Sequence, residues 1–287
     1  MNPPQCPFCA AQTARFGTKN GYELYECGMC DLLFVHPIPR DLATIYGEDY
    51  FRKDGAITSH GYTDYDKDKE PMRHVFEKYI ARCEKLTSGR RIFDVGAATG
   101  YVLDIAKRRG WTTFGSELSE YAGQEAGSRG HAITIGKLIT APMLPTVDAV
   151  MMWDVLEHVD DPRAYVKKMH DMLVERGVLM ISTPDRSSWW AKLMGMKWQL
   201  IIPPEHLYYY SPRNLTKLLQ DSGFKVLEVA KPSKRFSIPY VFSMLAQWQG
   251  LSLWKTLARL TDNKMFRSVV LPINLRDNMF IVAVKQR

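Results

Sequence analysis

The sequence of 287 residues contains no run of 18 or more apolar residues, so no segment has the length that a membrane-spanning helix requires. Its first ten residues, MNPPQCPFCA, lack a basic region followed by an apolar stretch, which a secretory signal would have. We therefore expect a cytoplasmic location. Hydrophobic residues make up 46% and charged residues 24% of the chain, which is ordinary for a globular protein.

Acidic residues are scarce in residues 231–287. This region holds ten Lys and Arg residues but only two Asp residues, a net charge of +8, whereas the whole chain carries +7, so the other 230 residues sum to −1. A basic region can bind an anionic partner, and it can equally be a solvated surface. The sequence leaves both interpretations open.

A glycine loop lies in RIFDVGAATGYV, residues 91–102, but it lacks two common nucleotide-binding patterns. Tyr101 stands where the third glycine of a dinucleotide fingerprint would follow Gly96, which weakens that interpretation. No Gly-Lys-Ser/Thr follows either, so the loop is not a Walker loop. It predicts a site for another nucleotide-like ligand.

From residue 71 onward, strand-like apolar runs alternate with segments of helical period. This alternation predicts an α/β fold, with a mostly parallel sheet between helices and a ligand site at the carboxyl ends of the strands. The final two strands lack a compact crossover helix of the usual kind, so we expect the last strand to insert antiparallel. The expected strands are a run ending at 94, then 111–118, 131–135, 147–153, 177–183, 224–230 and 278–285; the expected helices are 71–87, 100–109, 119–129, 161–175 and 211–223.

The arrangement of Asp94, Gly96 and Gly100 resembles motif I of the class I S-adenosylmethionine (SAM) dependent methyltransferases, in which a further glycine usually stands where this chain has Ala98. Glu117 follows Asp94 by 23 residues at the end of the next strand, where a carboxylate can accept hydrogen bonds from both ribose hydroxyls. The order FDVGAATG, FGSEL, VDAVMMWDVLEHVDDP and GVLMISTPD is similar to this family over about 210 residues. The resemblance implies a Rossmann-like methyltransferase sheet that binds SAM at these five residues.

Two histidines lie where substrate loops should follow the strands, His158 in WDVLEHVDDP and His206 in PPEHLYYYS. Methyl transfer to oxygen or nitrogen is a direct displacement that often needs a base, and a neutral imidazole suits that role. We favour His206 as the base, because the aromatic residues around it could shape an acceptor pocket; the alternative is a histidine that only holds the loop. The resemblance implies that His158, Trp153 and Asp154 border SAM or the acceptor.

Four of the five cysteines form two Cys-x-x-Cys pairs, Cys6 with Cys9 and Cys27 with Cys30, separated by 17 residues. This spacing is typical of a tetrahedral four-cysteine zinc site. Four thiolates leave no position for water, so we expect a structural ion. The sequence thus predicts a small zinc ribbon that metal binding helps to fold.

The phrases YECGMCDLLFVHPIP, IYGEDYF and GYTDY resemble the zinc-binding leader of bacterial methyltransferases associated with sugars, surface glycans and secondary metabolites. The expected organisation is a zinc ribbon at 1–39, a tyrosine-rich connector at 40–70 and a methyltransferase domain at 71–287. By the same resemblance the connector could form a lid over SAM. Packing between ribbon and domain is the alternative.

Residues 231–272 form a basic insertion in which apolar residues recur at near-helical spacing from 241 to 260. We expect an amphipathic helix that packs on the sheet or on a second subunit, which would make a homodimer. Peripheral contact with a membrane is the alternative.

Two absences narrow the methyl acceptor. WDVLEH stands in place of the Asn/Asp-Pro-Pro-Tyr/Phe motif found in many methyltransferases acting on amino groups of adenine or glutamine, and no Pro-Cys nucleophile of the type used for pyrimidine C5 methylation occurs. We expect methylation of oxygen, nitrogen or carbon in a sugar, nucleotide-sugar, glycan or related small molecule. The alternatives are an RNA methyltransferase that uses the basic C-terminal region, although the ribbon has no basic cluster, and a non-catalytic SAM-binding interaction protein.

Overall fold

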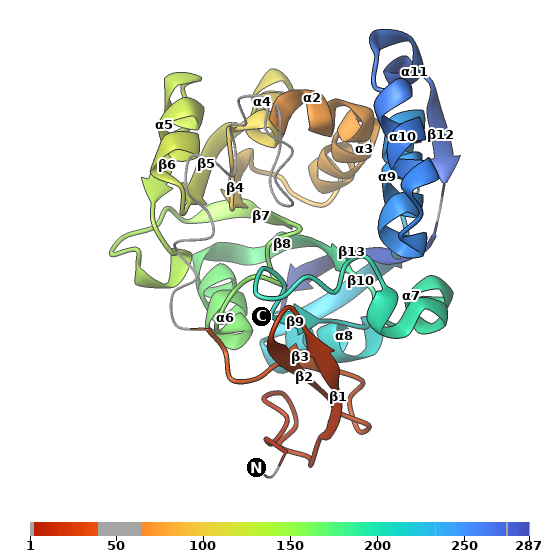
Figure 1. The fold of residues 1–287 in the computed structure, drawn as a ribbon. Helices are drawn as coiled ribbons and strands as arrows, with labels where there is room; N and C mark the ends of the chain where they lie inside the picture. The colour runs from red at the N-terminus through yellow and green to blue at the C-terminus, as the bar shows by residue number, and fades with distance from the viewer. Residues whose placement is uncertain (1–2, 40–64, 233, 274, 287) are drawn as a thin grey trace.

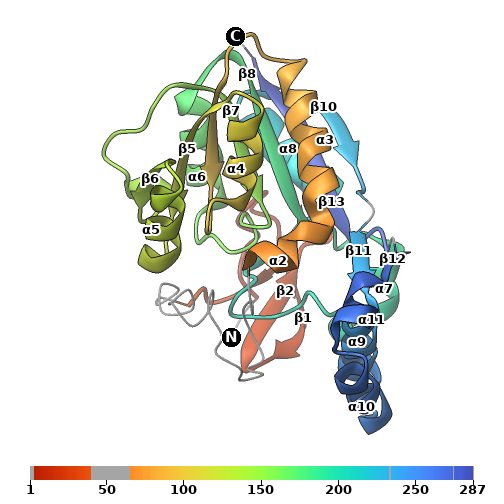
Figure 2. The same ribbon diagram turned by 90° about the horizontal axis from the view of Figure 1, so that it is seen from above.

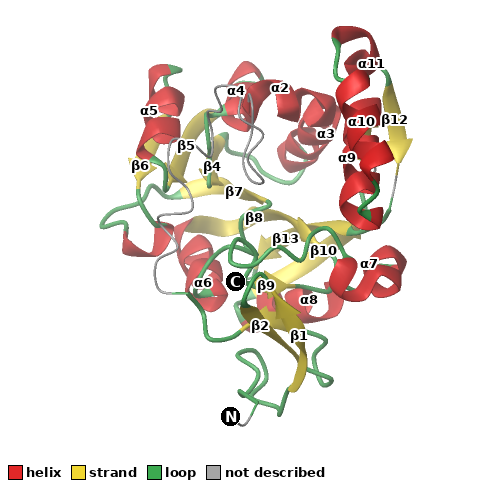
Figure 3. Cartoon of the chain, viewed as in Figure 1, coloured by secondary structure: helices red, strands yellow, loops and turns green. Residues whose placement is uncertain are grey.

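The computed structural model of the protein describes residues 3–39, 65–232, 234–273 and 275–286 (Figure 1). A large sheet with helices on both faces forms the body of the molecule, a smaller sheet lies beside it, and a group of helices stands at one end of the large sheet (Figures 1 and 3). The expected lid segment at 40–70 falls outside the described residues except for its last six.

The large sheet has seven strands in the order β10-β13-β8-β7-β4-β5-β6. β13 is antiparallel to both of its neighbours, whereas the pairs among β8, β7, β4, β5 and β6 are parallel. The Rossmann-like methyltransferase sheet and its antiparallel last strand are therefore confirmed. The strands are β4 (Arg91–Val95), β5 (Thr112–Glu117), β6 (Ala132–Ile135), β7 (Val147–Trp153), β8 (Leu173–Pro184), β10 (Phe224–Ala230) and β13 (Asn278–Lys285).

Successive residues of the central strands enter two different cores, because side chains alternate across a sheet. In β7, for example, Val150 and Met152 pack in the core that contains α6 and α8, whereas Met151 packs in the core that contains α3 and α4. Covering helices bury both faces, so the strands are nearly continuous apolar runs. Figure 2 shows these helices around the sheet: α3 (Arg73–Glu84), α4 (Tyr101–Arg108), α5 (Glu120–Ser128), α6 (Pro162–Met172) and α8 (Pro212–Asp221).

Polar side chains fix where several helices begin. The Ser119, Asp161 and Ser211 side chains each accept a hydrogen bond from a backbone N–H in the first turn of α5, α6 and α8, which satisfies donors that have no partner within the helix. Asn214 completes a capping box with Ser211. The sequence predicted these starts to within two residues.

Two predicted helices, 71–87 and 161–175, extend three residues beyond the observed ends of α3 and α6. The segment 161–175 was expected to be helical, but α6 ends at Met172 and β8 begins at Leu173, which pairs with Val147. Pairing with β7 and burial of Leu173 outweigh the local helical pattern. Tertiary contacts thus set this boundary.

The ribbon at the N-terminus and the methyltransferase part share one sheet. It contains β1 (Ala14–Lys19), β2 (Tyr22–Glu26) and β3 (Leu33–Val35), and its fourth strand is β9 (Tyr208–Tyr209) from the far part of the sequence. Leu33 pairs with Tyr209, and Phe34 with Tyr208. Backbone hydrogen bonds therefore join the ribbon to the far part of the chain in one continuous sheet.

The C-terminal insertion is a helical group closed at its base by a two-stranded ladder, β11 (Lys234–Ser237) with β12 (Val270–Ile273). Between these strands lie α9 (Ile238–Gln249), α10 (Ser252–Leu260) and α11 (Lys264–Ser268). The near-helical spacing thus corresponds to two helices, which Gly250 separates in a left-handed conformation. Within the described residues, none of the helices combines the length and the apolar character needed to cross a bilayer.

Candidate functional site

A pocket opens at the carboxyl ends of the parallel strands β4, β5, β6 and β7. It contains about 920 Å³ of empty space, which includes the open solvent at its mouth. Predicted residues and others that the sequence did not single out line it together: Tyr65, Lys69, Val95, Gly96, Ala98, Ser116, Glu117, Leu118, Gly136, Lys137, Leu138, Trp153, Asp154, Val155, His158, Val159, Asp160 and Tyr165.

Glycine is required at two positions of the loop between β4 and α4. Gly96 has a φ of 76°, and a Cβ there would lie 2.6 Å from Val155 Cγ2. Gly100 has a φ of 86°, and a Cβ there would lie 2.8 Å from His131 Cδ2. These left-handed conformations and close contacts exclude other residues. The loop therefore turns tightly and presents the start of α4 to the pocket.

Ala98 adopts a conformation that usually belongs to glycine. Its φ is 48°, and its N–H donates a hydrogen bond of 2.8 Å to Glu117 Oε2. A left-handed alanine costs about 1–2 kcal/mol. The Ala98 methyl group packs against Ala122, Tyr65 and Tyr121, so the departure from the family pattern fits into a small apolar contact beside the pocket.

The Glu117 carboxylate is fixed from both sides at the end of β5. Its Oε2 accepts from Ala98, and its Oε1 accepts a bond of 2.9 Å from the backbone N–H of Ser119. Burial raises the pKa of Glu117, while these backbone donors oppose that rise. Each carboxylate oxygen has a second lone pair, so Glu117 can also accept hydrogen bonds from two ligand hydroxyls.

Asp94 is a buried carboxylate that is not among the residues lining the pocket, although the next two residues along the chain, Val95 and Gly96, do line it. Its Oδ1 has no hydrogen-bond partner in the described part of the chain. Burial, with a further contribution from Glu117, raises the pKa of Asp94 well above its usual value. A buried carboxylate in this state favours a cationic ligand group that would compensate it. SAM carries an ammonium and a sulfonium, so the residues present fit this group.

Trp153 and Asp154 extend the site at the end of β7. Trp153 packs edge to face on Phe76 of α3, with ring centroids 4.7 Å apart. Asp154 has a φ of 52°, and its Oδ1 accepts hydrogen bonds from Ser182 Oγ at 2.7 Å and Asn278 Nδ2 at 3.3 Å. Both residues line the pocket, where the resemblance had placed them.

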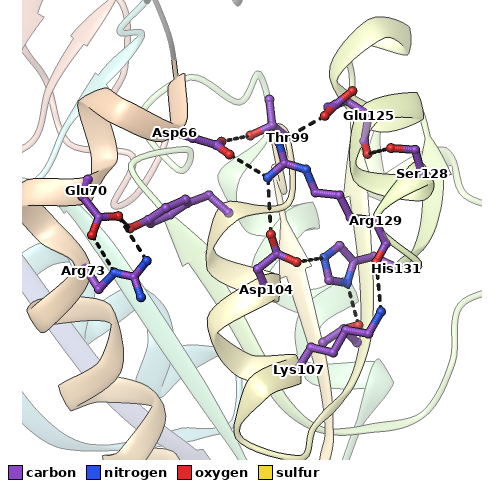
Figure 4. Close-up of polar contacts among 12 residues, drawn as sticks. Asp66, Glu70, Arg73, Thr99, Asp104, Lys107, Glu125, Ser128, Arg129 and His131 are labelled. Atoms are coloured by element: carbon purple, nitrogen blue, oxygen red, sulfur yellow. Dashed lines mark hydrogen bonds and ion pairs between the residues drawn. The ribbon is translucent and has the colours of Figure 1, made fainter.

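The sequence predicted the connector at 40–70 as a possible lid over SAM but no helix in it; its described end, α2 (Tyr65–Lys69), contributes Tyr65 and Lys69 to the pocket. Figure 4 shows how this helix is attached. Asp66 Oδ1 accepts a 2.6 Å bond from Thr99 Oγ1 of the glycine loop, and Asp66 Oδ2 forms a 2.7 Å ion pair with Arg129. In the next turn, η2 (Glu70–Met72), Glu70 accepts from the Tyr101 hydroxyl. The cofactor loop and α2 are thus joined by polar contacts.

Nor did the sequence predict the part of the pocket wall that follows β6. Gly136, Lys137 and Leu138 follow β6, and Lys137 Nζ forms a 2.6 Å ion pair with Asp160 across the pocket wall. Their position after a parallel strand is the signal that could have identified them, because ligands of such sheets bind beyond the strand ends.

The two predicted histidines lie together, with ring centroids 4.6 Å apart. His158 lines the pocket, and its Nδ1 lies 2.8 Å from the Glu205 carbonyl oxygen; His206 Nδ1 lies 2.8 Å from the Leu200 carbonyl oxygen. Since a carbonyl only accepts, both Nδ1 atoms carry the proton, and each neutral ring keeps Nε2 as its acceptor. Burial lowers the pKa of His158 to about 4, so this ring stays uncharged at neutral pH.

Donor atoms of Glu157, His158 and His206 lie within 4.8 Å of one another. Glutamate and histidine are also metal ligands, so this cluster could hold a divalent cation as well as move a proton. Glu157 accepts a 2.8 Å hydrogen bond from Thr183 Oγ1. The cluster therefore brings polar groups from two loops to the edge of the pocket.

The aromatic residues near His206 do not form the wall expected for an acceptor pocket. Tyr208, Tyr209 and Tyr210 are buried, and their hydroxyls donate to the backbone carbonyls of Asp160, His206 and Leu156. Trp198 is buried too and donates to Asp277. These side chains pack the loop of His206 against the ribbon and the sheet, and the described pocket lining contains none of them.

The four predicted cysteines converge at the far end of the ribbon. Cys6 and Cys30 Sγ atoms are 3.5 Å apart, as are those of Cys9 and Cys27, and all four lie within 4.8 Å of one another. Tetrahedral zinc with bonds of about 2.3 Å would separate its sulfurs by about 3.8 Å. The residues after each pair, Ala10 and Asp31, are both left-handed. This donor set suits a closed zinc site.

Comparison with known proteins gives one consistent result. A family model described as a methyltransferase domain matches residues 69–229, more than half of the chain. A ubiquinone biosynthesis O-methyltransferase of Dinoroseobacter shibae is 30% identical over 155 residues, which cover 49% of this chain and 62% of that protein. A protein of Mycolicibacterium smegmatis named as an S-adenosylmethionine-dependent methyltransferase is 26% identical over 159 residues, 53% of this chain and 57% of that one.

The matched region spans less than two thirds of each of these two relatives. Among solved structures, magnesium protoporphyrin IX methyltransferase of Synechocystis PCC 6803 with bound SAM has the same fold, with a TM-score of 0.51 and 16% identity over 86% of this chain and 99% of that chain. The sheet order and the match over residues 69–229 lead to one conclusion: the chain belongs to the methyltransferase domain family.

Proposed function

We propose that the protein transfers a methyl group from SAM to a hydroxyl of a small acceptor, of the sugar, nucleotide-sugar, glycan or related metabolite class. The observation that carries this proposal is the Glu117 carboxylate, which two backbone N–H groups hold at the pocket wall beside the glycine loop. When bound, SAM supplies an electrophilic methyl group on a sulfonium.

The chain's own residues account for cofactor binding. Glu117 accepts from ligand hydroxyls, and the buried Asp94 compensates a ligand cation. The glycine loop leads into α4, whose first N–H groups and helix dipole favour a carboxylate. The ligand class therefore combines hydroxyls, a cation and a carboxylate, as SAM does.

Proton removal from the acceptor is assigned to His206. Its Nδ1–H is held by the Leu200 carbonyl, so Nε2 can take a proton and the ring can keep that hydrogen bond as it becomes charged. His158 is a weak base, because burial lowers its pKa to about 4. We assign His158 to accepting a hydrogen bond from the acceptor or orienting it.

A hydroxyl acceptor is supported by the D. shibae relative, whose name states O-methylation in ubiquinone biosynthesis. The sugar and glycan class is supported by the leader sequence. Zinc at Cys6, Cys9, Cys27 and Cys30 is proposed as structural, because four thiolates complete its coordination.

Transfer of a labelled methyl group from SAM tests the function. The purified protein is incubated with SAM and sets of nucleotide-sugars, glycans and phenolic metabolites, and products are detected by radiolabel and by mass. We expect a gain of one methylene by an oxygen of one class. SAM binding without transfer to any class would instead support a non-catalytic SAM-binding protein.

The basic C-terminal region motivates RNA as a second acceptor. If RNA is the substrate, total RNA should accept label, and RNA binding should weaken steeply as salt rises. Absence of both responses, with transfer to a small molecule, would exclude this alternative.

A further inference from the structure

The helical group formed by α9, α10 and α11 carries a concentration of exposed apolar side chains that the proposed methyl transfer does not use. Within the described residues, fourteen large hydrophobic side chains are exposed, and half of them lie in these helices, their connections and the adjoining β12: Tyr240, Leu251, Leu253, Leu260, Met265, Val269 and Leu271. Leu260 is 68% and Leu253 57% exposed. Such a patch marks an interaction surface.

The internal packing of the group explains which side stays outside. Phe242 of α9 stacks on Trp254 of α10, with ring centroids 5.9 Å apart. Leu253 and Leu260 are seven residues apart, so they share a face of α10, and that face is directed away from this contact, as their exposure shows. α10 has no buried residue.

Charge accompanies this apolar surface. Between residues 234 and 273 the chain has six Lys and Arg residues and one Asp, a net charge of +5. Lys255 and Arg259 lie one turn apart on α10 and are exposed, and α9 contains no charged residue. Basic side chains beside exposed Leu and Tyr are the composition of helices that lie in a membrane interface.

The charge and the apolar character of this surface together distinguish among the partners that could bind to it. A second copy would bring a second +5 surface against the first, and like charges oppose that contact. Nucleic acid would pair with the Lys and Arg residues but leaves the leucines without a partner. An anionic bilayer complements both, because its headgroups attract the cations and its acyl boundary accepts the apolar side chains.

We propose that α9, α10 and α11 dock the protein peripherally on an anionic lipid bilayer. Figure 2 shows these helices extending beyond the large sheet on the side of α2, which lines the cofactor pocket. β11 at their base contacts η2. Docking thus brings the mouth of the pocket towards the membrane. Docking itself does not depend on the proposed methyl transfer. The further step, in which an acceptor embedded in the membrane reaches the pocket, does rest on the proposed methyl transfer.

Co-sedimentation with vesicles tests the surface. The full chain is mixed with vesicles of phosphatidylcholine alone or of phosphatidylcholine and phosphatidylglycerol in equal amounts. We expect binding to the anionic vesicles, weakening with salt, and little binding to phosphatidylcholine. Leu260→Glu and Leu253→Glu should each lower partitioning by about tenfold, because a carboxylate replaces an inserted side chain.

Met143→Glu is the matched control, because Met143 is 86% exposed on another part of the surface and the charge change is the same. It should bind vesicles like the wild type. Calorimetric SAM affinity, unchanged in all three variants, shows that the fold is intact and that a failure of docking is separate from a failure of methyl transfer. Equal binding to both lipids, equal loss in the control, self-association in place of vesicle binding, or retention on RNA alone would each overturn the proposal.

Discussion

Two buried carboxylates, Asp94 and Glu117, lie at or near the ends of β4 and β5, and Glu117 lines the pocket. Burial raises the pKa of both, so ionising them without a ligand costs folding free energy. For a carboxyl whose pKa is raised on folding, the stabilising contribution is complete below the unfolded pKa and is lost as pH rises through the folded pKa. The ligand-free protein therefore carries a local instability at neutral pH that a cationic ligand would relieve.

Replacing Asp94 by Asn should separate binding from stability. The neutral amide removes the buried charge, so we expect the melting temperature of the ligand-free variant to exceed that of the wild type by about 2–4 °C at pH 8, corresponding to about 1 kcal/mol. The difference should shrink towards pH 4, where the wild-type carboxyl is also neutral.

The same variant should bind SAM about tenfold more weakly or worse, because the compensating charge is gone. Calorimetric titration and thermal melts across pH measure both effects. An Asp94→Asn protein with unchanged SAM affinity would show that Asp94 serves only the loop.

Ala98 offers a test of backbone strain. Because its φ is 48°, Ala98→Gly should raise the free energy of unfolding by about 0.5–1 kcal/mol, less the packing lost from its methyl group. The neighbouring Ala97→Gly is the control: Ala97 is buried and has no positive φ, so it should lose about 1 kcal/mol. Urea unfolding compares them; equal losses in both would mean that Ala98 is unstrained.

The role of His206 should be visible in the turnover rate. His206→Gln keeps a polar side chain but cannot act as a base, so kcat should fall by about 100-fold or more. SAM affinity should be retained, since His206 is not in the pocket lining.

His74→Gln, at an exposed histidine, is the control for His206→Gln and should leave kcat unchanged. If wild-type activity instead requires added Mn²⁺ and His206→Gln abolishes binding of that ion, the cluster with Glu157 and His158 is a metal site. A full rate in His206→Gln would leave the histidine a loop-holding role alone.

At the scale of elements, α2 is the piece that closes one side of the pocket. Its polar contacts join Asp66 to Thr99 and Arg129, and Glu70 of the next turn to Tyr101 (Figure 4), and its Tyr65 side chain packs beside Ala98. Partly exposed polar pairs of this kind contribute about 1 kcal/mol each. Weakening one of them should therefore loosen α2 without unfolding the sheet.

Asp66→Asn should therefore speed ligand exchange. Losing the ion pair with Arg129 and weakening the bond to Thr99 should raise the dissociation rate of S-adenosylhomocysteine by about threefold to tenfold, measured by stopped-flow displacement. Glu125→Gln is the matched control, because Glu125 also pairs with Arg129, at 3.1 Å, but within α5. Equal acceleration in both variants would mean that Arg129, and not α2, sets the rate.

The strands and the main helices follow from local patterns, and therefore the sequence predicted them well. The loop glycines, Asp94 and Glu117 were predicted from the resemblance to a family motif; Gly96 and Glu117 line the pocket, whereas Asp94 and Gly100 are not among its lining residues. Local patterns could not predict the pairing of Leu33 with Tyr209, because the two residues lie far apart in the sequence. For that reason Tyr208 to Tyr210 were interpreted as pocket residues, although they are core.

At the scale of the whole molecule, the ribbon supports the loop of His206. β3 pairs with β9, Lys19 Nζ donates to the Met196 carbonyl at 3.1 Å, and Asn20 donates to the Pro203 carbonyl at 2.9 Å. All of these contacts fall within 196–209, on either side of the loop's histidine. No ribbon residue among those described lines the cofactor pocket. The ribbon also contacts α6, where Arg163 donates to the Phe8 carbonyl at 2.6 Å, and the residues after β8, where Arg186 pairs with Glu26. The loop of His206 is thus one of several links between the ribbon and the rest of the chain, and it is the link that holds the proposed base.

Loss of the metal should consequently affect acceptor turnover more than cofactor binding. Cys9→Ala removes one of four proposed ligands at an exposed position, so the substitution itself leaves no cavity. Because binding of a structural zinc ion is worth about 10–16 kcal/mol to a small finger, a defective site should loosen the ribbon and, through β3, release β9 and the loop of His206. Metal analysis should show less than one zinc per chain, and a first, low-temperature transition should appear in the melt.

SAM affinity of Cys9→Ala should stay within about twofold of the wild type, a change of roughly 0.4 kcal/mol, because β4, β5 and the glycine loop keep their own core. Turnover of the acceptor should fall by about tenfold or more as the His206 loop loses its position. Met29→Ala, between the second pair of cysteines and 64% exposed, should change neither quantity. A parallel loss of SAM affinity would mean that the ribbon also supports the cofactor side of the molecule. The effect of losing the metal would then not be confined to the loop of His206.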